Sequence, residues 1–190
     1  MSIKTRPTTA AQLFGQCEVA KRGRERIVDV AIELFCTHGF NAVGLDQILA
    51  QAGVTKTTFY KHFQSKDDLV VAAVRKRDEW EMQAWQRAVK NTVGDDPRQQ
   101  LVGFFDVLDT WFNAPDYKGC MFISAATEFP NPADPIHQAA AAHKKANRDL
   151  FRDLARKAGA SRADAEAFAD LYTMLFEGTL VLRHVHDRDD

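Results

Sequence analysis

The sequence has few cysteines and no long apolar run. Its three cysteines, Cys17, Cys36 and Cys120, are widely spaced and form neither a CxxC pattern nor a His-paired metal spacing. A disulfide framework and a structural zinc site are therefore not expected. No apolar run approaches the roughly 20 residues that span a bilayer, and the N-terminus lacks a signal-peptide hydrophobic region. We expect a soluble, cytoplasmic protein that does not bind membranes.

The motifs of common enzyme classes are also missing. The sequence contains no G-x-S-x-G nucleophile turn, no P-loop, no GxGxxG turn and no HExxH helix. Its acidic residues form no carboxylate pair spaced for acid–base chemistry. His184 and His186 are two residues apart on an expected helix, so they face away from each other. These absences argue against an enzyme, and we expect no cofactor and no bound metal.

Charge is divided unevenly along the chain, although the net charge is only −1. Residues 1–66 carry nine Lys and Arg against five Asp and Glu, whereas residues 67–190 carry sixteen against twenty-one. A basic N-terminal part suits DNA, because neutralised phosphates and released counterions supply most non-specific affinity. A solvated surface can show the same imbalance by chance, so the charge division only supports other observations.

Residues 45–63, LDQILAQAGVTKTTFYKHF, have the pattern of two short helices joined by a glycine turn. Apolar residues recur at helical spacing on both sides of Gly53, and a glycine accepts the positive φ of a tight turn. In the second helix Phe59 and Phe63 point inward. The outer side offers hydroxyls and hydrogen-bond donors from Lys56, Thr57, Thr58, Tyr60, Lys61 and His62. This is the outline of a helix-turn-helix, although an ordinary helical hairpin shares the bare pattern.

The flanking segments make the pattern specific. Residues 24–40, RERIVDVAIELFCTHGF, read as an amphipathic helix that Gly39 closes. Ser65 and Asp68 have the S-x-x-D spacing of a capping box that starts a long helix. Over roughly residues 22–75, this order of elements resembles the N-terminal domain of the tetracycline-repressor (TetR) family of bacterial regulators.

The resemblance implies an all-α fold, in which a three-helix helix-turn-helix domain precedes a larger helical bundle for effector binding and dimerisation. We expect a flexible N-terminal arm at 1–21, the DNA-binding domain at 22–66 and the bundle at 67–190. Further helices are expected at 66–91, 97–113, 119–129, 135–158 and 161–186. In the arm, Lys4 and Arg6 suit phosphates or a minor groove, although a solvated tail is an equal alternative.

By the resemblance, each subunit of a dimer sets its second short helix into the major groove of one half-site of a near-palindromic operator. Thr55 caps this recognition helix and reaches a phosphate, while Lys56, Thr57 and Thr58 approach base edges. The DNA backbone is held by Tyr60, Lys61, His62 and Lys66, and Arg24 is a further candidate. Gly44 and Asp46 depart from the family pattern, which usually has Thr or Ser and often a basic residue there.

Large aromatic side chains are abundant in the middle helices, where they are core residues by default. In the family that the chain resembles, these helices enclose a pocket for a small effector. The candidate lining residues are Trp80, Trp85, Phe104, Phe105, Trp111, Met121 and Phe122. His143 lies on an apolar stripe, so it is either a polar anchor for a ligand or a satisfied core residue. Cys120 is either packed or a redox trigger near a helix start.

The last two expected helices carry more apolar surface than a bundle of this size needs. By the resemblance, they pair with the same helices of a second subunit, and Gly178 lets them approach closely. The expected interface residues are Phe168, Leu171, Tyr172, Leu175, Gly178 and Leu182. The alternative is that these faces only close the core of the monomer.

Together these observations predict a sequence-specific DNA-binding transcriptional regulator, namely a repressor released from its operator by a small molecule. The expected partners are double-stranded DNA, an effector and a second copy of the chain. A constitutive regulator without an effector is the alternative within the same class. A helical protein-interaction module or an enzyme is the alternative from another class.

Overall fold

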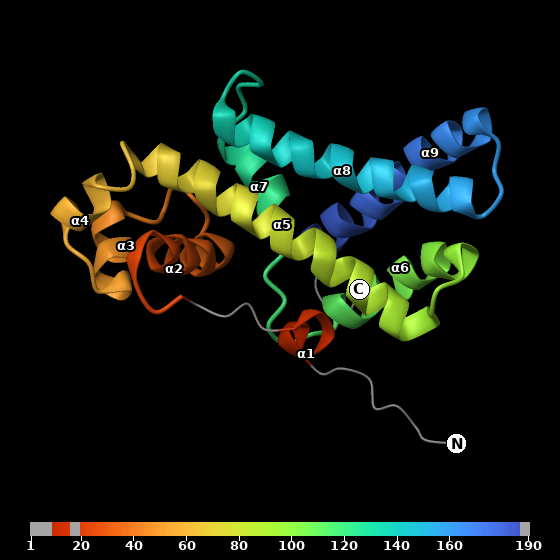
Figure 1. Cartoon of the computed structure of the whole chain (residues 1–190), viewed down its shortest axis with the longest axis horizontal. Helices are drawn as coiled ribbons and strands as arrows, with labels where there is room; N and C mark the ends of the chain where they lie inside the picture. Colours follow the sequence, from red (N-terminus) through yellow and green to blue (C-terminus); the bar gives the residue numbers. More distant parts are fainter. Residues whose placement is uncertain (1–8, 16–19, 187–190) are drawn as a thin grey trace. The chain divides into compact units, whose positions relative to one another are not determined.

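The computed structural model describes residues 9–15 and 20–186, and within these ranges all regular structure is helical (Figure 1). The helices are α1 (Ala10–Phe14), α2 (Gly23–His38), α3 (Leu45–Ala52), α4 (Lys56–Tyr60), α5 (Lys66–Val93), α6 (Pro97–Phe112), α7 (Met121–Glu128), α8 (Pro135–Lys157) and α9 (Arg162–Val185). The expected all-α fold is confirmed. No helix in the described ranges is long and apolar enough to cross a membrane.

The chain divides into two compact units. Among the described residues, the headpiece unit comprises 20–80 and 120–144, and the bundle unit comprises 9–15, 81–119 and 145–186. The long helices α5 and α8 each contribute one part to each unit. The DNA-binding domain expected at 22–66 is thus the first part of a larger compact unit, which also takes in the start of α5, α7 and the start of α8.

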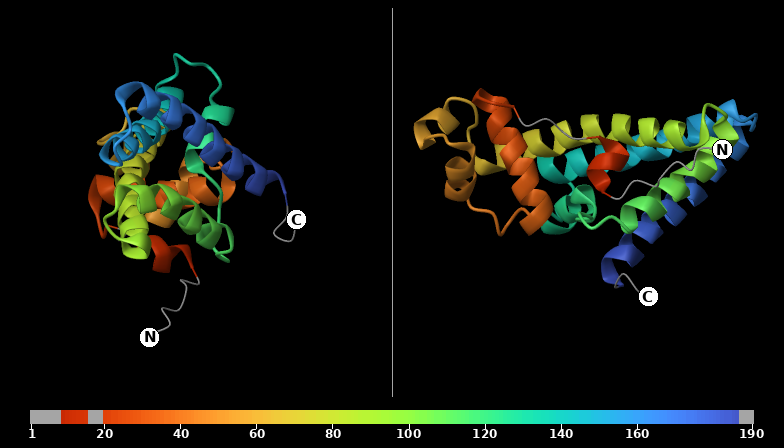
Figure 2. Two further views of the ribbon diagram at one scale, coloured as in Figure 1. Left: turned by 90° about the vertical axis from the view of Figure 1, so that its right-hand side faces the viewer. Right: turned by 90° about the horizontal axis from the view of Figure 1, so that it is seen from below.

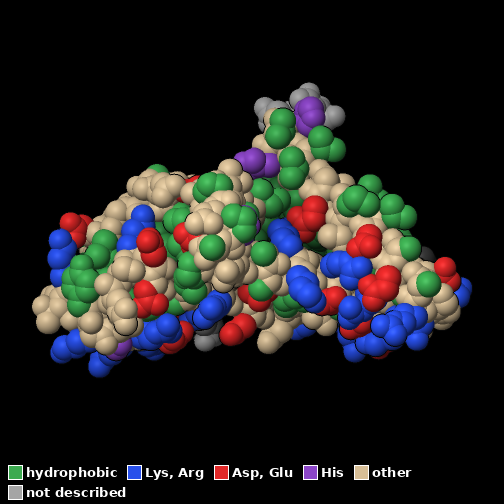
Figure 3. Space-filling model, turned by 90° about the horizontal axis from the view of Figure 1, so that it is seen from above, with side chains coloured by type: hydrophobic (Ala, Val, Ile, Leu, Met, Phe, Trp, Pro, Cys, Tyr) green, Lys and Arg blue, Asp and Glu red, His purple; other side chains and the backbone are tan. Residues whose placement is uncertain are grey.

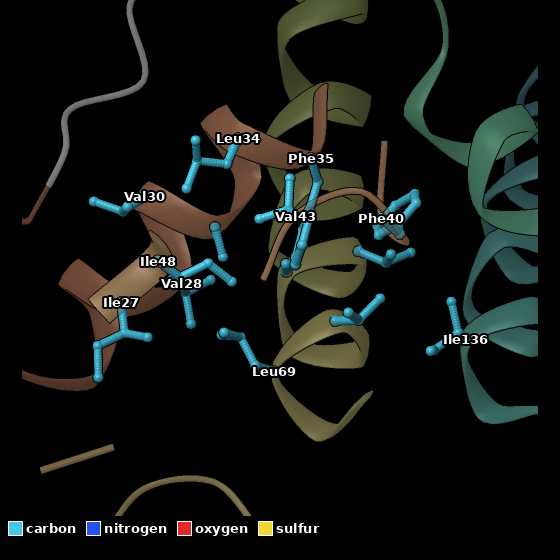
Figure 4. Packing of buried hydrophobic residues seen from close by; sticks show 14 of the residues in the cluster. Ile27, Val28, Val30, Leu34, Phe35, Phe40, Val43, Ile48, Leu69 and Ile136 are labelled. Atoms are coloured by element: carbon cyan, nitrogen blue, oxygen red, sulfur yellow. The ribbon is translucent and has the colours of Figure 1, made fainter. Parts of the chain in front are cut away.

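One continuous apolar cluster forms the core of the headpiece unit (Figure 4). It joins the helix-turn-helix segment to α2, to the start of α5, to α7 and to the start of α8. Ile27 of α2, Ile48 of α3 and Leu69 of α5 are fully buried in it, and Ile136 of α8 is almost fully buried. Apolar burial of this kind is the main favourable contribution to folding. Helices far along the chain therefore hold the short helices α3 and α4.

Aromatic rings fill the core of the bundle unit. Phe176 of α9 lies between Trp85 and Phe151, with ring centroids 5.6 and 5.3 Å away. Phe104 of α6 meets Phe151 edge to face at 5.1 Å, a favourable geometry for aromatic pairs.

The end of α8 and the start of α9 are joined by a short turn at residues 158–161 (Figure 2). Arg148 of α8 ties the two helices further, since its guanidinium pairs with Asp170 at 2.5 Å.

Residues 9–15, which fall within the expected flexible arm, contain a helix. A capping box between Thr9 and Gln12 starts α1. Phe14 at its end is buried, with its ring 5.0 Å from that of Trp85 and 5.8 Å from that of Trp111. Residues 9–15 are therefore part of the bundle unit, because one apolar ring docks them. The sequence pattern did not indicate this helix, since five residues are too few to show a period.

Phe59 provides a test of how the headpiece unit holds α4. It is the buried residue of this five-residue helix and is 0 % exposed. Phe59→Ala should lower the free energy of unfolding by about 3–5 kcal/mol, because it removes a buried ring and leaves a cavity. The exposed neighbour Thr57→Ala should change it by less than about 0.5 kcal/mol. Urea denaturation measures both, and equal effects of the two substitutions would contradict this packing.

Candidate nucleic-acid interface

The turn between α3 and α4 has the geometry that the sequence predicted. Gly53 adopts the left-handed conformation, with φ 70° and ψ 36°. The next amide, of Val54, donates to the carbonyl of Leu49 at 3.0 Å and so closes the end of α3. A residue with a Cβ would be strained at this φ. The two short helices are thus joined by the tight turn that a helix-turn-helix requires.

Helix α4 has a polar outer side and a buried inner side. The hydroxyl of Thr55 caps it by accepting a hydrogen bond from the amide of Thr58 at 3.2 Å. Phe59 faces inward, where its ring stacks on Phe63 at 5.4 Å. The exposed side chains of the outer side are Lys56, Thr57, Tyr60, Lys61 and His62. Thr58 is only half-exposed, and its hydroxyl lies 3.1 Å from that of Thr55.

Asp46 of α3 lies beside the start of α4. Its carboxylate pairs with the ammonium of Lys56 at 2.9 Å, and both side chains are exposed. The hydrogen bond from Lys56 to this carboxylate, together with its negative charge, raises the pKa of Lys56. The acidic residue that departs from the family pattern therefore engages a lysine expected at base edges.

Lys66 has a partner within the headpiece unit. Its ammonium donates a hydrogen bond to the carbonyl of Phe40 at 2.6 Å, in a partly buried position. One of the three donors of the group expected to hold a phosphate is thus engaged inside the protein. The sequence did not indicate this bond, because Phe40 lies 26 residues from Lys66 and helical periodicity does not reveal contacts at that separation.

The start of α2 is held by a buried carboxylate. Asp29 accepts a hydrogen bond from the amide of Ala20 at 2.8 Å and pairs with Lys76 of α5 at 2.6 Å. Arg24 is half-exposed and lies over the ring of Phe63 at 4.9 Å, next to α4. This places a cation beside the recognition helix. The contacts expected of Lys4 and Arg6 lie outside the described residues.

The residues expected to line an effector pocket belong to two separate cores. Trp85, Phe104 and Trp111 are buried in the bundle unit, whereas Met121 and Phe122 are buried in the headpiece unit. The other two are less buried: Phe105 meets the ring of Tyr172 at 5.2 Å, and Trp80 lies under the guanidinium of Arg77 at 4.5 Å. Phe14, Phe151 and Phe176, which were not predicted to lie beside these residues, also pack among the aromatics of the bundle unit. The helical spacing of Phe151 and Phe176 assigns them to a core but not to a particular one, and Phe14 lies on a helix too short to show a spacing.

His143 is a satisfied core residue. Its Nδ1 lies 2.7 Å from a carboxylate oxygen of Asp78, and its ring stacks on Phe122 with centroids 3.5 Å apart. The residue is 2 % exposed. Of the two alternatives for His143, the structure favours the satisfied core residue over the polar anchor for a ligand, because a carboxylate 65 residues away already binds the ring. Cys120 is half-buried and accepts a hydrogen bond from Lys144 at 3.4 Å.

A cavity of about 210 Å³ lies in the bundle unit. Phe104, Leu150 and Leu154 supply apolar side chains to it, and Lys90 and Lys157 contribute cationic ones. Lys90 pairs with Asp95 at 2.7 Å. This cavity shares one residue, Phe104, with the pocket expected from the sequence.

The residues expected at a dimer interface fall on two faces of α9. Phe168, Leu171, Leu175 and Leu182 are exposed, and Leu171 is 65 % exposed. Tyr172 is buried instead, and its hydroxyl donates to the carbonyl of Leu101. Burial raises the pKa of this phenol. Tyr172 is therefore a core residue of the bundle unit, which corrects the sequence-based grouping.

The exposed apolar face of α9 is wider than expected. It extends to Val185 and also includes Met174 and Val181, which were not predicted to lie on it. Figure 3 shows hydrophobic side chains gathered along the C-terminal part of α9. Gly178 lies within this face, and a Cβ added to it would meet no atom within 4 Å.

Two family models match the chain, one in its N-terminal part and one in its C-terminal part. Residues 27–73 match the model of bacterial regulatory proteins of the tetR family. Residues 97–190 match the C-terminal domain of LmrA/YxaF-like transcriptional regulators. The chain belongs to the TetR family. It is therefore a transcriptional regulator with a DNA-binding helix-turn-helix, as the sequence predicted.

Individual relatives agree with this assignment. The HTH-type transcriptional regulator LmrA of Bacillus subtilis is 26% identical over 161 residues, which are 84% of this chain and 85% of LmrA. A TetR-family transcriptional regulator from Streptomyces coelicolor is 30% identical, with 87% and 80% of the chains covered and a TM-score of 0.75. A tetR-type regulator from Streptomyces avermitilis is 26% identical, with 87% and 88% covered and a TM-score of 0.72. Because these relatives are transcriptional regulators, the prediction that the chain is not an enzyme is confirmed.

Proposed function

We propose that the protein is a homodimeric repressor that binds a near-palindromic operator and leaves it when a small molecule binds. The main observation behind the proposal is that α4 has an exposed polar side and a buried apolar side. Its outer side offers exposed donors and hydroxyls, while Phe59 anchors its inner side in the headpiece core. A recognition helix needs both features, because it must be held firmly and still reach base edges.

The outer residues of α4 divide by position and chemistry. Thr57 and Lys56 lie at the start of the helix, the end that approaches base edges in a helix-turn-helix. Tyr60, Lys61 and His62 follow at its other end, where they reach the sugar–phosphate backbone. Arg24 adds a cation from α2 beside Phe63. Contacts to bases give sequence preference, and contacts to phosphates give affinity and register.

The apolar face of α9 supports a homodimer. Six of its positions, at residues 168, 171, 175, 178, 182 and 185, are separated alternately by three and four residues. This spacing is that of a seam between two packed helices. Gly178 near its middle leaves room for a partner backbone. A two-fold dimer presents two α4 helices, which is why the operator should be near-palindromic.

Release by an effector is supported by the family and by the cavity in the bundle unit. Asp95 of the lining pairs with Lys90, which leaves Lys157 as the cation for a ligand beside the apolar side chains. This lining suits a small molecule that has an apolar body and an acidic group. Such a molecule can shift the protein between two states only if it binds one of them more tightly. A constitutive regulator is the second candidate, because the tightly packed aromatics and the paired His143 favour a core without a ligand.

Lys61 and Lys66 allow a direct test of the phosphate contacts. Lys61→Ala should weaken DNA binding and reduce the log–log salt slope by about one, because one phosphate contact is lost. Lys66→Met should leave the slope unchanged, because its ammonium is bonded to Phe40. Fluorescence anisotropy across a salt series measures both. An unchanged affinity and slope for Lys61→Ala would remove this residue from the interface.

The dimer can be tested at the middle of the α9 seam. Leu175→Glu should produce monomers or insoluble protein at micromolar concentration, because pairing the helices would bury an unpaired carboxylate. Ala163→Glu adds the same charge at an exposed position of α9 outside the seam and should leave the dimer intact. Analytical ultracentrifugation separates these outcomes. A wild-type monomer, or a dimer of the Leu175→Glu variant, would end the model.

The cavity can be tested with a panel of small aromatic and aliphatic carboxylic acids. An effector should raise the melting temperature, because it stabilises the native state, and should weaken operator binding. Leu150→Trp fills part of the cavity and should abolish both effects while DNA binding persists. If a compound releases both proteins equally, its site lies elsewhere. If no compound has either effect, the constitutive candidate is favoured.

A further inference from the structure

Two side chains of opposite charge hold the turn between α2 and α3. Glu128, at the end of α7, accepts hydrogen bonds from the amides of Phe40 at 3.0 Å and Asn41 at 2.7 Å. Lys66, at the start of α5, donates to the carbonyl of Phe40 at 2.6 Å. All of these residues belong to the headpiece unit. The backbone on both sides of the Phe40 Cα is thus bound by side chains from outside the turn.

The shape of the turn is fitted to the Glu128 carboxylate. Gly39 has a φ of +81°, and a Cβ at this position would lie 2.9 Å from a Glu128 oxygen. Any other residue would be strained there and would crowd the carboxylate. The ring of Phe40 is fully buried between Phe35, at 4.9 Å, and Phe129, at 6.0 Å. The ring of Phe40 therefore contacts Phe129, and its backbone amide is bonded to Glu128, both at the end of α7.

We propose that Glu128 is a positioning residue for DNA recognition, through which α7 fixes the placement of α3 and α4. The inference rests on the proposed function of α4 as the DNA reader. Only Ala42, Val43 and Gly44 separate Asn41 from the start of α3, and Val43 is fully buried. A shift of the turn must therefore displace α3. Because Glu128 lies 87 residues beyond Asn41, its carboxylate is a polar link from a late helix to the turn that leads into the reading helices.

The physical effect of losing the carboxylate follows from the two amides that it satisfies. The Phe40 amide is partly buried, so the loss of its acceptor is costly, whereas the Asn41 amide is exposed and water can replace the carboxylate there. The turn would therefore rearrange to bring the Phe40 amide to water. A glutamine side chain retains one acceptor oxygen and replaces the other with a donor, so it can satisfy only one amide. The fraction of molecules with α3 and α4 correctly placed would fall, and the apparent DNA affinity falls by the same factor.

The test compares Glu128→Ala and Glu128→Gln with a matched control, Glu33→Gln. Glu33 is exposed on α2, so this control removes the same charge without touching the turn. The probe is a duplex that the wild-type protein selects from a random-sequence library. Glu128→Ala should bind it about tenfold more weakly, Glu128→Gln should lie in between, and Glu33→Gln should match the wild type. The salt slope should stay at the wild-type value in all variants, because no phosphate contact is lost.

Amide hydrogen exchange without DNA supplies a readout that a general loss of stability would not reproduce. In Glu128→Ala, the amides of Phe40 and Asn41 should exchange faster. The helical amides of Ile48 and Phe59, which donate to Gly44 and Thr55, should keep their protection. If the alanine variant does not fold, the glutamine variant carries the same comparison.

Two results would overturn the inference. One is wild-type DNA affinity in Glu128→Ala despite faster exchange in the turn, because the contact would then be only local. The other is unchanged exchange at Phe40 and Asn41, because the carboxylate would then not hold the turn. A wild-type protein that selects no duplex would instead overturn the proposed function, and the two failures are thus distinguishable.

Discussion

A helix of five residues is not stable alone in water, because the unfavourable free energy of nucleation exceeds the stabilisation from so few hydrogen bonds. The recognition helix α4 is such a helix, and the burial of Phe59 is what fixes it to the protein. Its hydroxyl cap at Thr55 and the left-handed Gly53 determine where it begins. The polar outer side exists as an ordered surface only because this ring is held in the headpiece core.

That core is assembled from segments far apart in the sequence. Ile136 of α8 and Phe122 of α7 belong to the same apolar cluster as Ile27 and Ile48. The Glu128 carboxylate adds a polar connection at the turn before α3. In a regulator of this family, the helices that follow the helix-turn-helix thus contribute directly to the unit that reads DNA. A change in the position of α7 has a short physical route to α4 through packed and hydrogen-bonded groups.

The sequence predicted the helices and their ends well, because these depend on local features. Thr55, Gly53 and Gly39 act within a few residues of their positions, and the apolar period shows which face is buried. Partners that are distant in sequence could not be predicted. The phenol of Tyr172 meets a carbonyl 71 residues away, so its helical spacing with Leu175 was misleading. His143 likewise pairs with a carboxylate 65 residues away, and Phe14 docks a helix too short to show a period.

In the proposed homodimer, two copies of the chain present two α4 helices to one two-fold DNA site. A hydroxyl-radical footprint on a duplex selected by the wild-type protein is the most direct test of this arrangement. We expect two protected regions related by a dyad, with centres separated by a whole number of helical turns of about 10 base pairs. A single protected region without a symmetric counterpart, at protein concentrations that saturate the duplex, would show that the two helices do not read one two-fold site.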